Sequence, residues 1–278
     1  MAKLAAVAFR NGGPIEAWMG VGKIYNPGVP TILVPTTAGT GSEATPNAIV
    51  SGSDGTKAGI VSPFLMAATV ILDPELTLTA PSKVIASTGI DALAHAVESY
   101  TGKKANPLSD DFAIAAVRGI LSSLKGAYEV PAGVASREAV LVASFRAGQA
   151  LTAAGTTAVH ALAYAIGSAY HIPHGVANGM LLVPVLSFNS DACADRLGEL
   201  CRISGNASGV KSGADTFLDY IEALVRDVGI PDSLPSFGAR ECDISALAAQ
   251  ALKATRLMDN NPKTMGIADV SGIFAALL

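Results

Sequence analysis

Charged and aromatic side chains are scarce in this chain of 278 residues: 15% of the residues are charged, 5% are aromatic, and half are hydrophobic. No long basic run is present, so we expect neither a nucleic-acid partner nor a polybasic contact with a membrane surface. The hydrophobic half can bury a large core in one large domain or two ordinary ones. The apolar opening MAKLAAVAF ends at Arg10, too early for a membrane span, and predicts a helix.

Cysteine is also rare, and its spacing excludes two common uses. Cys193, Cys201 and Cys242 are odd in number and lack the close spacing of a metal-binding or redox pair. Such a set is typical of reduced thiols in a cytosolic protein, so the sequence predicts a cytoplasmic location.

The spacing of apolar residues along the sequence changes near residue 80. Short β-type runs, separated by Gly, Pro and Asp turn signals, occupy 30–37, 47–52 and 68–74. Beyond this point apolar residues recur at helical spacing, in 109–126 after the N-cap candidate Ser109 and again in 213–228. The sequence therefore predicts an α/β or β-rich part over 1–80, followed by an all-α part over 81–278.

The predicted helical half contains all four histidines of the chain: His95, His160, His171 and His174. Asp91 and His95 are four residues apart, so on a helix their side chains share one face about 6 Å apart along the axis. His160 and His174 would be about 21 Å apart on one continuous helix. However, Pro173 disfavours helix just before it and lets the chain fold back, so that these two imidazoles can meet near one ion.

Three imidazoles and one carboxylate form a donor set that suits Zn²⁺ or Fe²⁺ better than Ca²⁺ or Mg²⁺. A lone histidine on an apolar helix is more often a hydrogen-bonded core residue. Here Asp91 would be buried among alanine and leucine with no Lys or Arg between Lys83 and Lys103, and a cation would compensate its charge. Glu98 lies one turn beyond His95. It is interpreted as a solvated residue at the rim of the site, in preference to a residue that supports a metal ligand.

Five stretches resemble, in order, the successive signatures of the iron-containing (group III) alcohol dehydrogenase family: PTTAGTGSEAT (35–45), ILDPELT (71–77), GIDALAHAVESY (89–100), VHALAYAIGSAYHIPHG (159–175) and MDNNP (258–262). The resemblance covers nearly the whole chain and implies the dehydroquinate synthase-like architecture of that family. It also implies that 1–80 form a partial α/β cofactor-binding domain and 81–278 an α-helical metal-binding domain. It implies Fe²⁺ or Zn²⁺ held by Asp91, His95, His160 and His174. It also implies hydride transfer between NAD or NADP and a small primary alcohol, diol or aldehyde.

The loop PTTAGTGSEAT carries the candidate cofactor-binding residues, which are Thr36, Thr37, Gly39, Thr40 and Ser42. Its hydroxyls can donate hydrogen bonds, and its glycines would let the backbone approach a ligand closely. Spacing alone favours an ordinary glycine-rich turn, whereas the resemblance implies contact with the cofactor's phosphates and nicotinamide ribose. For Lys57 the resemblance implies a place near the ribose, and a solvated hairpin charge is the alternative.

Two departures from the family pattern affect these expectations. Family members usually begin with a further α/β region that includes a GGGS loop, and MAKLAAV resembles the helix just after that loop. We therefore expect most of the N-terminal dinucleotide-binding region to be absent, which favours self-association into a homo-oligomer through uncovered apolar surface. A metal-binding remnant without dehydrogenase activity is the alternative function. Many members carry a histidine where this chain has Tyr164, so Tyr164 or His171 is the candidate for proton transfer.

Overall fold

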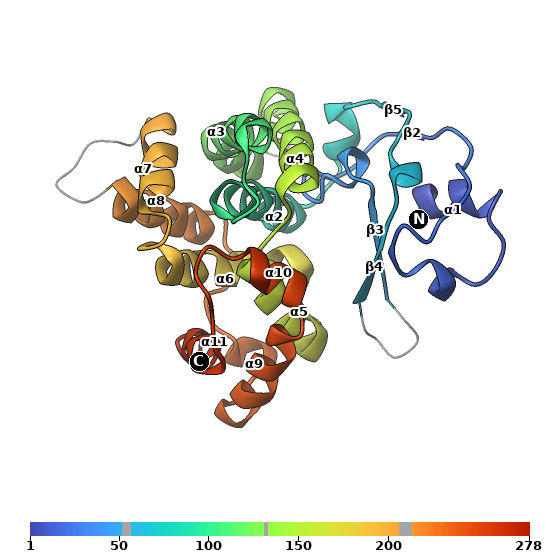
Figure 1. The fold of residues 1–278 in the computed structure, drawn as a ribbon. Helices are drawn as coiled ribbons and strands as arrows, with labels where there is room; N and C mark the ends of the chain where they lie inside the picture. Colours follow the sequence, from blue (N-terminus) through green and yellow to red (C-terminus); the bar gives the residue numbers. More distant parts are fainter. Residues whose placement is uncertain (52–56, 131–132, 206–212) are drawn as a thin grey trace.

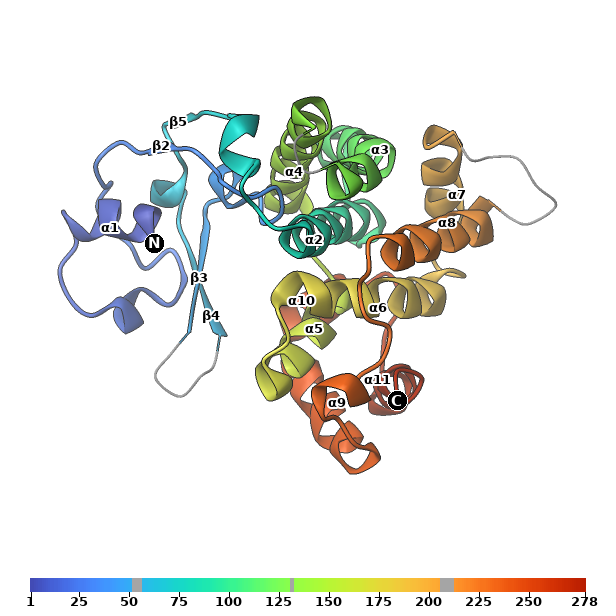
Figure 2. The same cartoon turned by 180° about the vertical axis from the view of Figure 1, so that it is seen from behind.

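The computed structural model describes residues 1–51, 57–130, 133–205 and 213–278. Figures 1 and 2 show two parts side by side: an N-terminal part of short strands and turns, and a larger helical part that carries the C-terminus. The change falls just before α2 (Ser82–Thr101), close to the predicted change of texture near residue 80. The division of the chain into two domains at this point stays a prediction.

The N-terminal part is built on two small sheets. In the first, β1 (Gly20–Val21), β4 (Lys57–Val61) and β3 (Asn47–Ser51) lie in that order; β4 is antiparallel to β3 and parallel to β1. In the second, β2 (Ile32–Leu33) runs parallel to β5 (Thr69–Val70). The helix α1 (Ala2–Ala8) and the 3₁₀ turns η1 (Ile15–Trp18), η2 (Ser42–Ala44), η3 (Pro63–Leu65) and η4 (Pro74–Thr77) connect them. All three predicted strands are confirmed, in shorter form.

A small hydrophobic cluster of its own stabilises the N-terminal part. Its buried members are Leu4, Val7, Trp18, Ile24, Ile60 and Leu65. The members come from α1, the turn η1, the following loop, β4 and η3, so the cluster joins the ends of this part. It includes Trp18, the only tryptophan of the chain, which is 7% exposed.

The helical part surrounds α2. The other helices are α3 (Pro107–Glu129), α4 (Val134–Ala154), α5 (Ala158–Tyr170), α6 (His174–Asn189), α7 (Ala194–Ile203), α8 (Gly213–Asp227), α9 (Ile244–Leu252), α10 (Thr255–Asn260) and α11 (Ile267–Ala275), with the 3₁₀ turns η5 (Pro235–Phe237) and η6 (Glu241–Asp243). Every residue from Gly89 to Thr101 of α2 is buried, because α3, α4 and α6 pack around this helix. A helix that is buried on all sides leaves no face for a solvated charge.

Local signals place the helix ends with two differences from the predictions. The predicted N-cap Ser109 lies inside α3. The true N-cap is Asn106, whose Oδ1 accepts from Ser109 N at 3.2 Å while Ser109 Oγ accepts from Asn106 N at 2.9 Å, a capping box just ahead of Pro107. The predicted break before His174 is confirmed, since His171 adopts a left-handed conformation with φ 55° and α6 starts directly after Pro173.

The structure shows where the three cysteines lie and how long and how apolar the helices are. Cys193 and Cys201 are buried and Cys242 is exposed, and none of the three forms a disulfide. Among the described residues, no helix combines the length and the apolar character needed to cross a lipid bilayer.

A buried lysine ties α1 to the loop that follows the candidate cofactor residues. Lys3 is 6% exposed, and its Nζ donates to the carbonyls of Ser42 at 2.7 Å and Thr45 at 2.9 Å, and also to that of Asn47. Burial lowers the pKa of Lys3 to about 8, and the charge of Glu43 opposes this shift. The ammonium group therefore fixes the path of the chain from η2 into β3.

Replacing Lys3 by Met should destabilise the N-terminal part by about 1–3 kcal/mol, because buried carbonyls lose their donor. The loss should grow as pH rises from about 8 to 10.5, because in that interval the unfolded lysine holds a proton that the folded one has released. Urea unfolding followed by Trp18 fluorescence measures both effects. The exposed Lys23→Met variant is the control, and a pH-independent difference would contradict the shift.

Candidate metal centre

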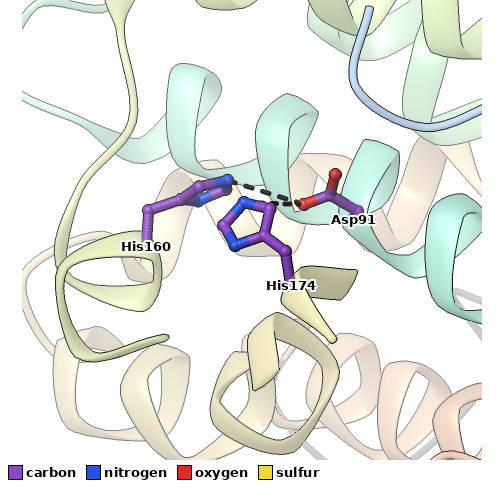
Figure 3. Close-up of side chains that lie close together, drawn as sticks. All are labelled: Asp91, His160 and His174. Atoms are coloured by element: carbon purple, nitrogen blue, oxygen red, sulfur yellow. Dashed lines mark ion pairs between the residues drawn. The ribbon is translucent and has the colours of Figure 1, made fainter. Parts of the chain in front are cut away.

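Three helices bring an acid and two imidazoles together (Figure 3). Asp91 lies on α2, His160 on α5, and His174 at the first position of α6. Asp91 Oδ1 is 3.6 Å from Nε2 of His160 and 3.6 Å from Nε2 of His174, and the candidate ligand atoms all lie within 4.8 Å of one another. Ligands at about 2.1 Å from a tetrahedral ion are about 3.4 Å apart, so this spacing suits one ion.

The close approach of α6 to α2 puts His174 in place. A Cβ added to Gly175 would lie 2.1 Å from the carbonyl oxygen of Ser87, so only glycine lets the start of α6 touch α2 here. The PHG motif thus has a steric explanation. Pro173 lies just before the first residue of α6, and Gly175 lets α6 pack against the helix that carries Asp91.

His95, the fourth predicted ligand, does not belong to the group of three whose candidate ligand atoms lie within 4.8 Å of one another. Its ring stacks on that of His160 with centroids 4.6 Å apart and planes at 25°. Burial lowers its pKa, and its Nδ1 is buried with no hydrogen-bond partner. A buried polar atom without a partner costs free energy, which a bound ligand could recover. The donor chemistry and this unpartnered nitrogen both fit a divalent transition metal.

Asn178 is a site residue that sequence reasoning missed. It lies one turn after His174 on α6, and its Nδ2 donates to Asp91 Oδ1 at 2.6 Å. The same nitrogen is 3.3 Å from His160 Nε2 and 3.2 Å from His174 Nε2, while its own Oδ1 has no partner. Its position four residues after His174 was the only available signal. The Asn178 amide is thus a single weak hydrogen-bond donor that faces Asp91, His160 and His174, whereas a cation would attract all three of these groups.

Glu98 was wrongly interpreted as a rim residue, since its side chain is fully buried. Its Oε1 accepts from Thr157 N at 2.9 Å, Thr157 Oγ1 at 2.7 Å and Val159 N at 2.9 Å, which are groups at the start of α5. Its Oε2 is hydrogen-bonded to Nδ1 of His160. The prediction failed because α2 has no solvent face. Glu98 instead caps α5 and orients one of the proposed ligands.

The charges of this cluster support one another. Burial alone would raise the pKa of Asp91, but His95, His160 and His174 hold it below its ordinary value. Burial likewise opposes the charged form of His160, yet Glu98 and Asp91 raise its pKa to about 9. With Nδ1 bonded to Glu98, the other ring nitrogen of His160 faces Asp91.

The two candidates for proton transfer lie in different surroundings. The ring of Tyr164 stacks on His174 with centroids 5.5 Å apart and meets His160 edge-on at 6.4 Å. Burial raises the pKa of Tyr164 to about 12. His171 is exposed at the end of α5, and no hydrogen bond or ring contact joins it to the cluster within the described parts of the chain. Only Tyr164 is brought to the site.

The candidate cofactor loop lies between β2 and η2. A cavity of about 240 Å³ is lined by residues that include Thr36, Thr37, Thr40 and Ser42. Gly39 has a packing role: a Cβ there would lie 2.6 Å from Thr88 Cβ on α2. A backbone hydrogen bond also joins Gly39 to His95 and raises the pKa of that imidazole. Close contact with α2 thus explains this glycine. Lys57 begins β4, and its side chain lies outside the description.

The α/β part carries a threonine-rich loop, and this loop packs against the helical part, which carries three imidazoles and a carboxylate. Such an arrangement is typical of a metal-dependent dehydrogenase. Comparison with known families agrees. Residues 1–74 match the profile of iron-containing alcohol dehydrogenases, and residues 85–278 match that of the C-terminal part of the Fe-containing alcohol dehydrogenase family. The chain belongs to the iron-containing alcohol dehydrogenase family.

Individual relatives give the same result. Long-chain-alcohol dehydrogenase 1 of Geobacillus thermodenitrificans is 37% identical over 99% of this chain and 71% of its own length. The crystal structure of a 1,3-propanediol oxidoreductase superposes with a TM-score of 0.95 at 34% identity, covering 99% of this chain and 73% of that one. Sulfoacetaldehyde reductase from Bifidobacterium kashiwanohense, solved with NAD⁺, gives 0.90 at 32% identity, covering 99% and 72%. The predicted family, fold class and enzyme class are thereby confirmed.

Replacing either His160 or His174 by Ala should remove most of the transition metal that the purified protein carries, because three donors cannot hold the ion as four do. Elemental analysis measures this directly. The matched control is His171→Ala, which removes an exposed imidazole outside the cluster and should leave the metal content unchanged. Equal metal content in all three variants would contradict the assignment.

Replacing Glu98 by Gln should weaken metal binding about 10- to 100-fold, because an amide holds the Nδ1–H of His160 less strongly than a carboxylate does. A competition titration with a chelator measures the affinity. The exposed Glu138→Gln variant on α4 controls for the change of charge, and an unchanged affinity in Glu98→Gln would show that the orienting contact is dispensable.

Proposed function

We propose that the protein interconverts small primary alcohols or diols and their aldehydes, using a nicotinamide cofactor and a divalent metal held by Asp91, His95, His160 and His174. The observation that carries the proposal is the convergence of these side chains from α2, α5 and α6. When bound, the ion supplies a Lewis acid for the substrate oxygen. The nicotinamide supplies or accepts the hydride at its C4 atom.

The residues of the chain position and shield this chemistry. Asp91 supplies a buried carboxylate beside the imidazoles, and Glu98 fixes the orientation of His160. Tyr164 covers one side of His174 and helps exclude water from it. With a pKa of about 12, Tyr164 stays protonated at neutral pH and can donate a hydrogen bond. Because Tyr164 contacts His160 and His174 whereas His171 is exposed, we assign proton transfer at the site to Tyr164 in preference to His171.

The metal and the nicotinamide cofactor can be assigned from the family description and from a related structure. We propose Fe²⁺ in preference to Zn²⁺ because the family is described as iron-containing, and NAD because a relative was solved with NAD⁺. The cofactor would lie along the loop of Thr36, Thr37, Thr40 and Ser42, which borders both the 240 Å³ cavity and α2. Three cysteines that form no disulfide support a cytoplasmic location. We propose no function for Lys57 beyond proximity to the ribose.

A metal-binding remnant without dehydrogenase activity is the less favoured alternative. The similarity to dehydrogenases spans 99% of this chain, including the candidate cofactor loop as well as the helical part. Nothing in the site geometry favours metal binding without redox chemistry.

Metal-loaded protein should oxidise NADH in the presence of a short aldehyde, and Asp91→Asn should lower kcat/KM about 100-fold or more, because the only carboxylate of the set is lost. NADH absorbance follows the reaction. Asn178→Ala is an informative comparison, since it removes a neighbour of Asp91 but no proposed ligand. Metal-loaded protein that binds NADH yet reduces no aldehyde would favour the alternative.

A further inference from the structure

A second cavity, of about 210 Å³, lies between the β3–β4 hairpin and the helical part. Its walls come from the strand ends at Asn47 and Val61, from the end of α4 and the link to α5, and from α10. In Figures 1 and 2 the hairpin and α10 belong to the two different parts of the protein, so the cavity lies where these parts face each other.

The charged groups that line this cavity are both cations. Lys104 and Arg256 both line it, whereas no carboxylate does. Neither cation has an ion-pair partner among the residues that the structure describes, although the chain as a whole carries a net charge of −4. The amide of Asn47 lies on the same wall. Two uncompensated cations in one cavity attract an anion.

The cavity lies next to the metal centre. Its floor is the link of Gly155 and Thr156, which runs directly into Thr157, a hydrogen-bond partner of Glu98, and so towards His160. On its far side Arg256 is close enough to Tyr164 to lower the pKa of that phenol, against burial that raises it, and Tyr164 stacks on His174. The lining of the cavity is therefore connected to the candidate ligands in two ways, through Thr157 and Glu98 to His160 and through Arg256 and Tyr164 to His174.

The remaining lining suits a short carbon chain. Val61, Leu151 and Leu257 supply apolar surface to the lining. A hydrocarbon segment can contact these side chains while a charged end meets the guanidinium group. Arginine binds carboxylates, sulfonates and phosphates particularly well because its planar fork donates two parallel hydrogen bonds.

We propose that the preferred substrates carry an anionic group at the end opposite the reacting alcohol or aldehyde, and that Arg256, assisted by Lys104, binds that group. This inference rests on the proposed dehydrogenase function. The guanidinium and ammonium groups at the cavity orient the substrate with its uncharged, reacting end towards Tyr164 and the metal centre.

The test compares ω-hydroxy acids of three to six carbons with the corresponding ω-hydroxy amides, which match them in size but lack the charge. The wild-type protein should give a higher kcat/KM for the acids, with an optimum at one chain length. Arg256→Gln should reduce the acid-to-amide ratio about 10- to 100-fold, largely through KM, and leave the amides unchanged. Lys104→Gln should have a smaller effect in the same direction. The exposed Arg118→Gln variant on α3 is the control.

Binding of butanoate and butanamide, measured by calorimetry, gives a readout that needs no turnover. Acid-selective binding that Arg256→Gln abolishes supports the inference even if no alcohol is oxidised, in which case only the proposed function fails. Equal use of acids and amides, or an acid preference that survives the double variant, would overturn the inference. It would also be overturned if Arg256→Gln weakened NADH binding while substrate preference stayed the same, because the cations would then serve the cofactor.

Discussion

The buried carboxylate of Glu98 is the contact on which the site depends. It lies on α2, it satisfies backbone and hydroxyl donors at the start of α5, and it holds Nδ1 of His160. Without it, the buried amides of Thr157 and Val159 would lose the acceptor that they share, since the side chain of Thr157 does not cap that helix. One side chain therefore fixes both the position of α5 and the orientation of the imidazole that α5 carries towards Asp91.

Two buried acids on one helix would be costly unless their surroundings favoured the charged form. Glu98 is stabilised by hydrogen bonds from α5 and by His160, so its pKa is held below the ordinary value despite burial. Among the described residues, Asp91 accepts from the Asn178 amide and lies 3.6 Å from Nε2 of His160 and of His174, of which His160 also acts on it as a hydrogen-bond donor. Glu98 is therefore neutralised by the protein, whereas Asp91 is left with donors too weak for a buried charge. This difference is the physical reason to assign Asp91 to an ion and Glu98 to support.

The sequence predicted much of this arrangement because the relevant signals are local. Spacing of four residues put Asp91 and His95 on one face, and Pro173 predicted the break that lets α6 fold back. The solvent exposure of Glu98 could not be predicted in this way. Helical periodicity places Glu98 near the Asp91 face, but only tertiary packing shows that α2 has neighbours on every side. Asn178 was missed for the same reason, since its partners are distant in sequence.

The glycines of the cofactor loop show a second limit of local reasoning. A Gly-rich turn has the same sequence whether its glycines admit a ligand or a helix. Here Gly41, with φ 55°, meets Gly148 of α4 so closely that a Cβ would lie 2.6 Å from its Cα, and Gly39 meets Thr88 of α2. The loop is therefore fixed against the helical part, and its carbonyl at Gly39 reaches His95. Because the same backbone segment carries Thr36, Thr37 and Thr40, these hydroxyls are held at a constant distance from the metal centre. Hydride transfer requires such fixed geometry between cofactor and substrate, so helix packing at these glycines would itself serve catalysis.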